Sequence, residues 1–125
     1  MPRLPIRRQL PLLAFLVLWN VGCSDSQPGE IEVFLISPNG PETAAIVELE
    51  GVFDRVTAPA SAVVFSEIVG GRTRVAILMR NFGDVWFRVF VPSLSDPPAA
   101  RVLEVADPYN EIRDDLEGYA IQFGR

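Results

Sequence analysis

Two sets of residues in this chain carry groups that could do chemistry. Cys23 is the only cysteine, and therefore the only thiol. The densest group of carboxylates lies near the C-terminus, at Asp107, Glu111, Asp114, Asp115 and Glu117. Because Ca²⁺ takes several carboxylate or carbonyl oxygens, this acidic group is a candidate calcium site. Its spacing contains no D-x-D-x-D-G loop, and acidic residues of a short helix usually face water, so we expect no bound metal there.

Most enzyme classes are excluded by the residue types that are missing. The chain has no histidine, which removes the commonest general base and the imidazole metal ligands, while a single cysteine permits no disulfide within the chain. It also contains no G-x-S-x-G, P-loop or Gly-rich dinucleotide motif. Two carboxylates could hydrolyse a glycoside, but that reaction needs a cleft, for which so small a domain has little room. We expect a protein that is not an enzyme and has no cofactor, with a small carboxylate-based hydrolase as the least favoured alternative.

The segment before Cys23 predicts where the protein is delivered. Arg3, Arg7 and Arg8 precede a mostly apolar run at 9–19, QLPLLAFLVLW. This run is too short to span a bilayer, which takes about 20 apolar residues. A basic start, a short apolar middle and a small residue before the cut are the parts of a secretory signal peptide, so we expect an exported protein.

The end of this segment resembles the lipobox of bacterial lipoproteins. Val21, Gly22 and Cys23 match its last three positions, while Asn20 stands where leucine is usual. The resemblance implies that the Cys23 thiol receives a diacylglycerol, that cleavage occurs just before it, and that two or three acyl chains then anchor the protein in the membrane. Ser24, in place of Asp, fits sorting to the outer membrane of a Gram-negative cell. An ordinary secreted protein with an unpaired thiol is the alternative.

The lipoprotein interpretation divides the chain into a signal peptide at 1–22, a flexible tether at 23–29 and one domain at 30–125. After cleavage, eight arginines, no lysine and sixteen carboxylates remain, which gives a net charge of −8. Phosphate binding depends on clustered Lys and Arg, so we expect no nucleic-acid partner.

Alternating apolar and polar residues predict about seven to nine strands. The clearest alternation is at 43–50, where Ala45, Val47 and Leu49 point inward and Ile46 is an exception. Two runs rich in β-forming residues, 61–69 and 72–79, flank Gly70 and Gly71, which is a strong hairpin signal because a type I′ turn needs positive φ at both positions. Further strands are predicted at 31–36, 52–56, 85–91, 100–105 and 119–123.

One short helix is predicted near residues 108–117. Asp107 and Pro108 are a typical helix start, Tyr109, Ile112 and Leu116 share one helical face, and Gly118 suits the position after the helix. The expected fold class is therefore an all-β, antiparallel β-sandwich, immunoglobulin- or cohesin-like, with this single helix.

The stretch 74–92 (RVAILMRNFGDVWFRVFVP) and a closing element made of Leu116, Gly118, Tyr119, Ile121 and Phe123 resemble a set of small bacterial lipoproteins of uncharacterised role. Similar patterns occur in cohesin-like sandwiches, which bind dockerin modules. Such a likeness implies a fold and does not carry a function.

The candidate binding residues lie in and before the most apolar predicted strand. Trp86, Arg88 and Phe90 share one face by period two, and Phe82 precedes them. This face either packs against the domain with Arg88 paired to a carboxylate, which is the favoured interpretation, or it is a ligand-contact stripe. We expect an envelope lipoprotein that binds a protein or glycan partner through a sheet face or edge. A structural or accessory subunit of an envelope assembly is the alternative.

Overall fold

The computed structural model describes residues 27–124 as an all-β domain, with no helix among these residues. It contains eight strands: β1 (Gly29–Ile36), β2 (Glu42–Glu50), β3 (Val56–Thr57), β4 (Ala62–Val69), β5 (Arg72–Gly83), β6 (Trp86–Val91), β7 (Ala100–Ala106) and β8 (Ala120–Gly124). Cys23, the predicted signal peptide and most of the predicted tether lie outside the described residues.

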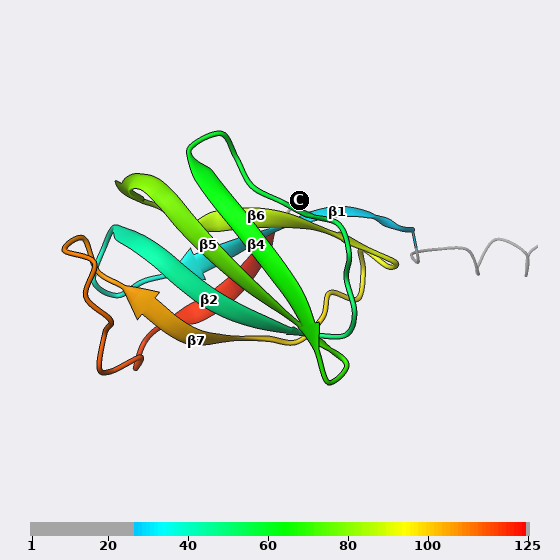
Figure 1. The fold of residues 1–125 in the computed structure, drawn as a ribbon. Coiled ribbons are helices and arrows are strands. Elements are labelled where there is room, and N and C mark those ends of the chain that lie inside the picture. Colours follow the sequence, from blue (N-terminus) through cyan, green and yellow to red (C-terminus); the bar gives the residue numbers. More distant parts are fainter. Residues whose placement is uncertain (1–26, 125) are drawn as a thin grey trace, which may run out of the picture.

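The strands form two antiparallel sheets that face each other (Figure 1). Sheet A has the order β3-β6-β1-β8, and sheet B has the order β4-β5-β2-β7. The pairs β1–β8, β2–β7, β3–β6 and β4–β5 are nested, so the chain resembles one long hairpin folded over on itself. Pairs β1–β6 and β2–β5 then join the arms of this hairpin within each sheet.

The core fills the space between the two sheets. Sheet A contributes Val33, Phe87 and Val89, and sheet B contributes Val47 and Ile77, all of them fully buried. Their neighbours along each strand point to the outside, as the two-residue period of a strand requires. The packing of two apolar inner faces supports the predicted β-sandwich architecture.

The predicted hairpin at Gly70 and Gly71 is confirmed. Both glycines have positive φ, 59° and 78°, and they connect Val69 to Arg72, the last pair of the β4–β5 ladder. These angles are those of a type I′ turn, in which the flanking residues form a hydrogen-bonded pair. This pairing sets the phase of the whole ladder.

The predicted helix at 108–117 is wrong, because this part of the chain forms a tight turn and an irregular loop. The Asn110 backbone N–H donates to the Asp107 carbonyl, and the Asp107 N–H donates to the Glu111 carbonyl. Asn110 itself is left-handed, with a φ of 64°, which ends any helical run. These features describe a type I turn followed by a residue with positive φ, a common hairpin loop. The same residues that begin a helix also begin this turn, since Asp and Pro suit its first two positions.

Candidate functional site

The predicted binding residues do not form one surface. Trp86, Arg88 and Phe90 lie on β6 and point outward from sheet A, as the alternation predicted. Phe82 lies near the end of β5, in sheet B, and its side chain is exposed. The structure therefore keeps three of the four residues together and assigns the fourth to a different sheet.

The aromatic residues on sheet A are already engaged within the domain. The Trp86 ring stacks on Phe34 of β1 with a centroid distance of 5.8 Å, and the Arg88 guanidinium lies 4.7 Å from the centre of the Trp86 ring. Arg88 also forms an ion pair of 4.0 Å with Glu32, its direct partner across the strands. This arrangement supports the interpretation in which Arg88 is paired to a carboxylate. It leaves less aromatic surface for stacking on a ligand.

A second aromatic contact extends the same face. The Arg55 guanidinium lies 3.8 Å from the centre of the Phe90 ring. Cation–π contacts at exposed sites stabilise by about 0.5–1 kcal/mol, so they hold the rings in place without burying them. On the outer face of sheet A, an arginine thus lies over each of the Trp86 and Phe90 rings.

The outer face of sheet B carries two apolar rows of residues that the sequence-based prediction did not single out. The strand registers place the members of each row side by side. One row is Val63, Leu78, Ala44 and Ala106, and the next is Phe65, Ala76, Ile46 and Glu104. Phe65 is 63% exposed and Leu78 is 45% exposed. The small alanines between these larger side chains leave shallow hollows on the face.

The next row on this face alternates in charge. Glu67, Arg74, Glu48 and Arg101 lie side by side on β4, β5, β2 and β7. Arg74 donates to Glu48 at 3.1 Å and Arg101 donates to its other oxygen at 3.0 Å. The hydrogen bond from Arg74 and that from Arg101 lower the pKa of Glu48 despite its partial desolvation. These two arginines cover the carboxylate, so Glu48 is buried although it points away from the core.

Strand β4 forms an open edge of sheet B. Since Val69 and Arg72 form the pair that closes the type I′ turn, odd-numbered β4 residues bond to β5 and even-numbered ones present their backbone groups outward. The hydrogen bond from the Arg80 N–H to the Ser61 carbonyl agrees with this phase. Within residues 27–124, no bond is observed from the outward backbone groups of Val64, Ser66 or Ile68 to a further strand.

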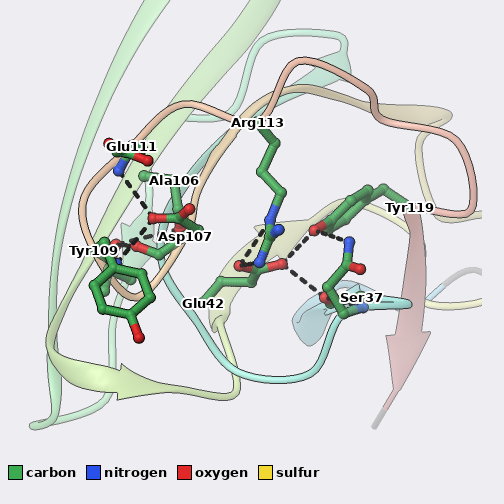
Figure 2. Close-up of polar contacts among 10 residues, drawn as sticks. Ser37, Glu42, Ala106, Asp107, Tyr109, Glu111, Arg113 and Tyr119 are labelled. Atoms are coloured by element: carbon green, nitrogen blue, oxygen red, sulfur yellow. Dashed lines mark hydrogen bonds and ion pairs between the residues drawn. The ribbon is translucent and has the colours of Figure 1, made fainter.

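A buried polar cluster closes the end of the sandwich where β1 turns into β2 (Figure 2). Glu42 is only 1% exposed, and Figure 2 shows Arg113, Tyr119 and Ser37 converging on its carboxylate. Arg113 donates to Oε1 at 2.9 Å, while Ser37 at 2.8 Å and the Tyr119 hydroxyl donate to Oε2. Asn39 in turn donates to the Tyr119 hydroxyl at 2.9 Å. Arg113, Ser37 and Tyr119 all donate to one carboxylate, so the cluster acts as a structural clamp.

The ionisation of Glu42 follows from these contacts. Burial raises the pKa of this carboxyl, but the hydrogen bonds from Arg113, Tyr119 and Ser37 more than offset that effect and leave the pKa below 4.5. Glu42 is therefore an anion at neutral pH. A carboxylate with all its acceptor positions occupied has no free lone pair with which to act as a general base.

The acidic residues at 107–117 do not form a metal site in the described part of the chain, where no group of three or more potential ligands is close enough to hold an ion. Asp107 instead accepts hydrogen bonds from the backbone N–H groups of Tyr109 (2.8 Å) and Glu111 (3.0 Å). These bonds, that of Glu111 first, lower the pKa of Asp107. Figure 2 shows this carboxylate folded back onto its own turn.

No family model matches the chain, and comparison with curated proteins and with solved structures finds no match either. Among the described residues, no helix is long and apolar enough to cross a membrane. The lipoprotein and cohesin-like resemblances therefore remain predictions.

Proposed function

We propose that the chain is a lipid-anchored protein of the cell envelope whose β-sandwich has no catalytic role and binds a protein partner along strand β4. The sequence ending in Val21-Gly22-Cys23 supports the anchor. The observation that carries the binding proposal is the open edge of β4, which combines backbone groups that have no strand partner within residues 27–124 with exposed apolar side chains.

An edge of this kind is suited to a partner strand. Natural sheet edges are usually blocked by lysine, proline or a bulge, because an unprotected edge pairs with other chains. Strand β4 has none of these features, and Glu67 is its only charged residue. A partner segment would gain main-chain hydrogen bonds from Val64, Ser66 and Ile68, and side-chain contacts would then give specificity.

A protein partner is better supported than a glycan. Sugar recognition uses exposed aromatic faces, whereas Trp86 is stacked between neighbours on sheet A. Strand addition instead uses the backbone, which β4 presents without competition from the rest of the described domain. The glycan alternative thus has less structural support.

The anchor would leave β4 accessible. The domain begins at Gly29, beside Val91, at the end of the sandwich opposite to residues 107–118, which are orange in Figure 1. A lipid on Cys23 would hold the Gly29 end toward the membrane. Strand β4 runs along the side of the sandwich between the two ends, so its edge would face the space beside the membrane rather than the lipid itself.

The open edge also favours the second candidate, a structural or accessory subunit of an envelope assembly. The two candidate functions differ in the lifetime of the complex, because an accessory subunit stays paired with its partner whereas a binding module exchanges it.

For the fold relationship, we propose a β-sandwich of immunoglobulin or cohesin kind. Two antiparallel sheets support it, but β7 borders β2 here, where the immunoglobulin order has the first strand.

The anchor is tested by Cys23→Ser. When whole cells are extracted with a detergent that separates into two phases, we expect the wild-type protein in the detergent phase and the variant in the aqueous phase. Equal partitioning of both proteins would refute the lipid anchor.

The edge is tested by site-specific photo-crosslinking at Ile68 in living cells. We expect one discrete protein adduct that is lost in Ser66→Pro and kept in Ser66→Ala. Proline removes an outward N–H, a position where edge strands tolerate it. Crosslinking at Tyr109, an exposed residue that follows β7 at the other edge of sheet B, is the control. An adduct that survives Ser66→Pro unchanged would refute strand addition at this edge.

A further inference from the structure

The rows on the outer face of sheet B are complementary to themselves under a two-fold rotation. A two-fold axis that runs along the strands, between β5 and β2, places β4 of one copy over β7 of the other and β5 over β2. Each row then faces the same row of the second copy in reverse order. Such a pair of faces is favourable only if each residue lies opposite one of complementary charge or size.

The charged residues meet opposite charges. In the row Glu67, Arg74, Glu48, Arg101, the reversal brings Glu67 over Arg101 and Arg74 over Glu48 of the second copy. The same operation brings Arg72 over Glu50. The exposed charges Glu67, Arg101, Arg72 and Glu50 therefore each face a charge of opposite sign, which is the complementarity expected of a specific interface. Glu48 is already covered by its own Arg74 and Arg101.

The apolar residues meet partners of complementary size. Leu78 faces Ala44, and Ile46 faces Ala76, so that each large side chain lies over a small one. Val63 similarly faces Ala106 at the edge. Alternating large and small residues across facing positions let two layers interdigitate. Phe65 faces Glu104 at the margin, where interfaces are normally polar and reached by water.

We propose that a second copy of this chain packs its sheet B face to face on this one, related by a two-fold axis between β5 and β2. The occupant is a second copy because the charge pattern complements its own reversal. This inference uses the face of sheet B rather than the β4 edge, and it requires neither the lipid anchor nor the partner strand. Face-to-face sheets of this kind pack with their strands aligned within about 30°.

The size of the face determines how strong this dimer is. Four strands and four outward rows cover roughly 500 Å² on each copy, from the spacing and rise of β-strands. The total of about 1,000 Å² lies at the low end of specific interfaces, so we expect a dimer that exchanges with monomer.

The experiment uses the purified full chain, in a mild detergent that also keeps a lipidated form in solution, with molar mass measured by light scattering over a concentration series. Glu67→Arg and Arg101→Glu each place two like-charge contacts in a homodimer, and each is expected to raise the dissociation constant at least about tenfold. An equimolar mixture of the two variants restores both contacts. We therefore expect the mixture to dimerise at concentrations where neither variant dimerises alone.

A second reciprocal pair, Glu50→Arg and Arg72→Glu, gives an independent test, since Arg101 contacts Glu48 closely within the chain, at 2.9 Å. Arg72 lies farther from Glu48, at 3.9 Å, and from Glu50, at 3.8 Å, and circular dichroism checks that each variant is folded. A wild-type protein that stays monomeric at all concentrations, or mixtures that associate no better than the single variants, would overturn the proposal. Dissociation by Ser66→Pro would also overturn it, because that result indicates pairing through the β4 edge. A dimer unaffected by Ser66→Pro supports the face, whatever the crosslinking at Ile68 shows about a partner strand.

Discussion

Substituting Glu42 by glutamine should destabilise the domain more than any exposed charge substitution. Glutamine keeps the shape of the side chain but removes the charge and presents an NH₂ group where an acceptor oxygen met its donors. Arg113 then loses its only ion-pair partner among the described residues. Figure 2 shows that no other carboxylate drawn there contacts its guanidinium.

The magnitude follows from the burial of this pair. Removing one partner of a buried ion pair costs roughly 3–5 kcal/mol. The Arg113 side chain is 23% exposed, so water relieves part of that cost and we expect about 3 kcal/mol. For a domain of this size, each kcal/mol lowers the melting temperature by about 4–8 °C, which gives a decrease of about 12–24 °C.

The pH dependence gives a second readout. Because the folded pKa of Glu42 lies below 4.5, its contribution to the free energy of unfolding is fully present above pH 4.5 and is lost as the pH falls through the folded pKa. The difference in stability between wild type and Glu42→Gln should therefore shrink in acid. Asp107 and Glu48 are present in both proteins, so their own titrations cancel in this difference.

The measurement is urea unfolding monitored by tryptophan fluorescence, at neutral pH and at several values below pH 4.5. Glu32→Gln is the matched control, because Glu32 pairs with Arg88 at 4.0 Å on a half-exposed surface and should change stability by less than about 1 kcal/mol. Equal losses in Glu42→Gln and Glu32→Gln would refute the clamp. A wild-type advantage that stays constant in acid would refute the assigned ionisation.

Three further predictions concern two turn residues with positive φ and one buried hydroxyl. Gly71→Val should cost about 1–2 kcal/mol in thermal unfolding, because φ is 78° there and β-branched residues avoid that region, and an unchanged melting temperature would contradict this. Asn110→Val should destabilise by about 1 kcal/mol while Asn110→Gly is nearly neutral, since φ is 64°; similar melting temperatures for both would contradict the left-handed turn. Thr73→Val should cost about 2 kcal/mol, because the buried hydroxyl donates to Gly51 at 2.8 Å and accepts from Phe53 at 2.9 Å, whereas Thr73→Ser should retain most of the stability.

Most strands were predictable because they obey a local rule: side chains alternate between a buried inner face and an outer face, and the pair Gly70-Gly71 favours a type I′ turn. The strand predicted at 52–56 is wrong in its bounds, since the structure has only the two-residue β3 (Val56–Thr57) there. The helix at 108–117 was not predictable in the same way. Asp107 and Pro108 start either a helix or a type I turn, and the choice depends on the left-handed Asn110 and on contacts with β7 that the local sequence does not contain.

The candidate site was predicted only in part, since its geometry depends on which strands become neighbours. Period two correctly placed Trp86, Arg88 and Phe90 on one face, but it could not show that Phe34 and Glu32 would occupy them. In the Glu42 clamp, Arg113 and Tyr119 are separated from Glu42 by 71 and 77 positions in the sequence, so no local pattern reveals it. One signal was available: Ile46 interrupts the polar outer positions of its strand, and it lies in the apolar row of sheet B.

The nested pairing also has a consequence for how the domain folds. The β4–β5 hairpin closes a short stretch of chain, whereas β8 must find β1 across almost the whole length of the domain. Such high contact order slows folding, because the entropy of closing a long loop is lost before its contacts form. Sheet A can be completed only after residues 120–124 have left the ribosome or translocon, so we expect the domain to reach its folded state only after these residues emerge.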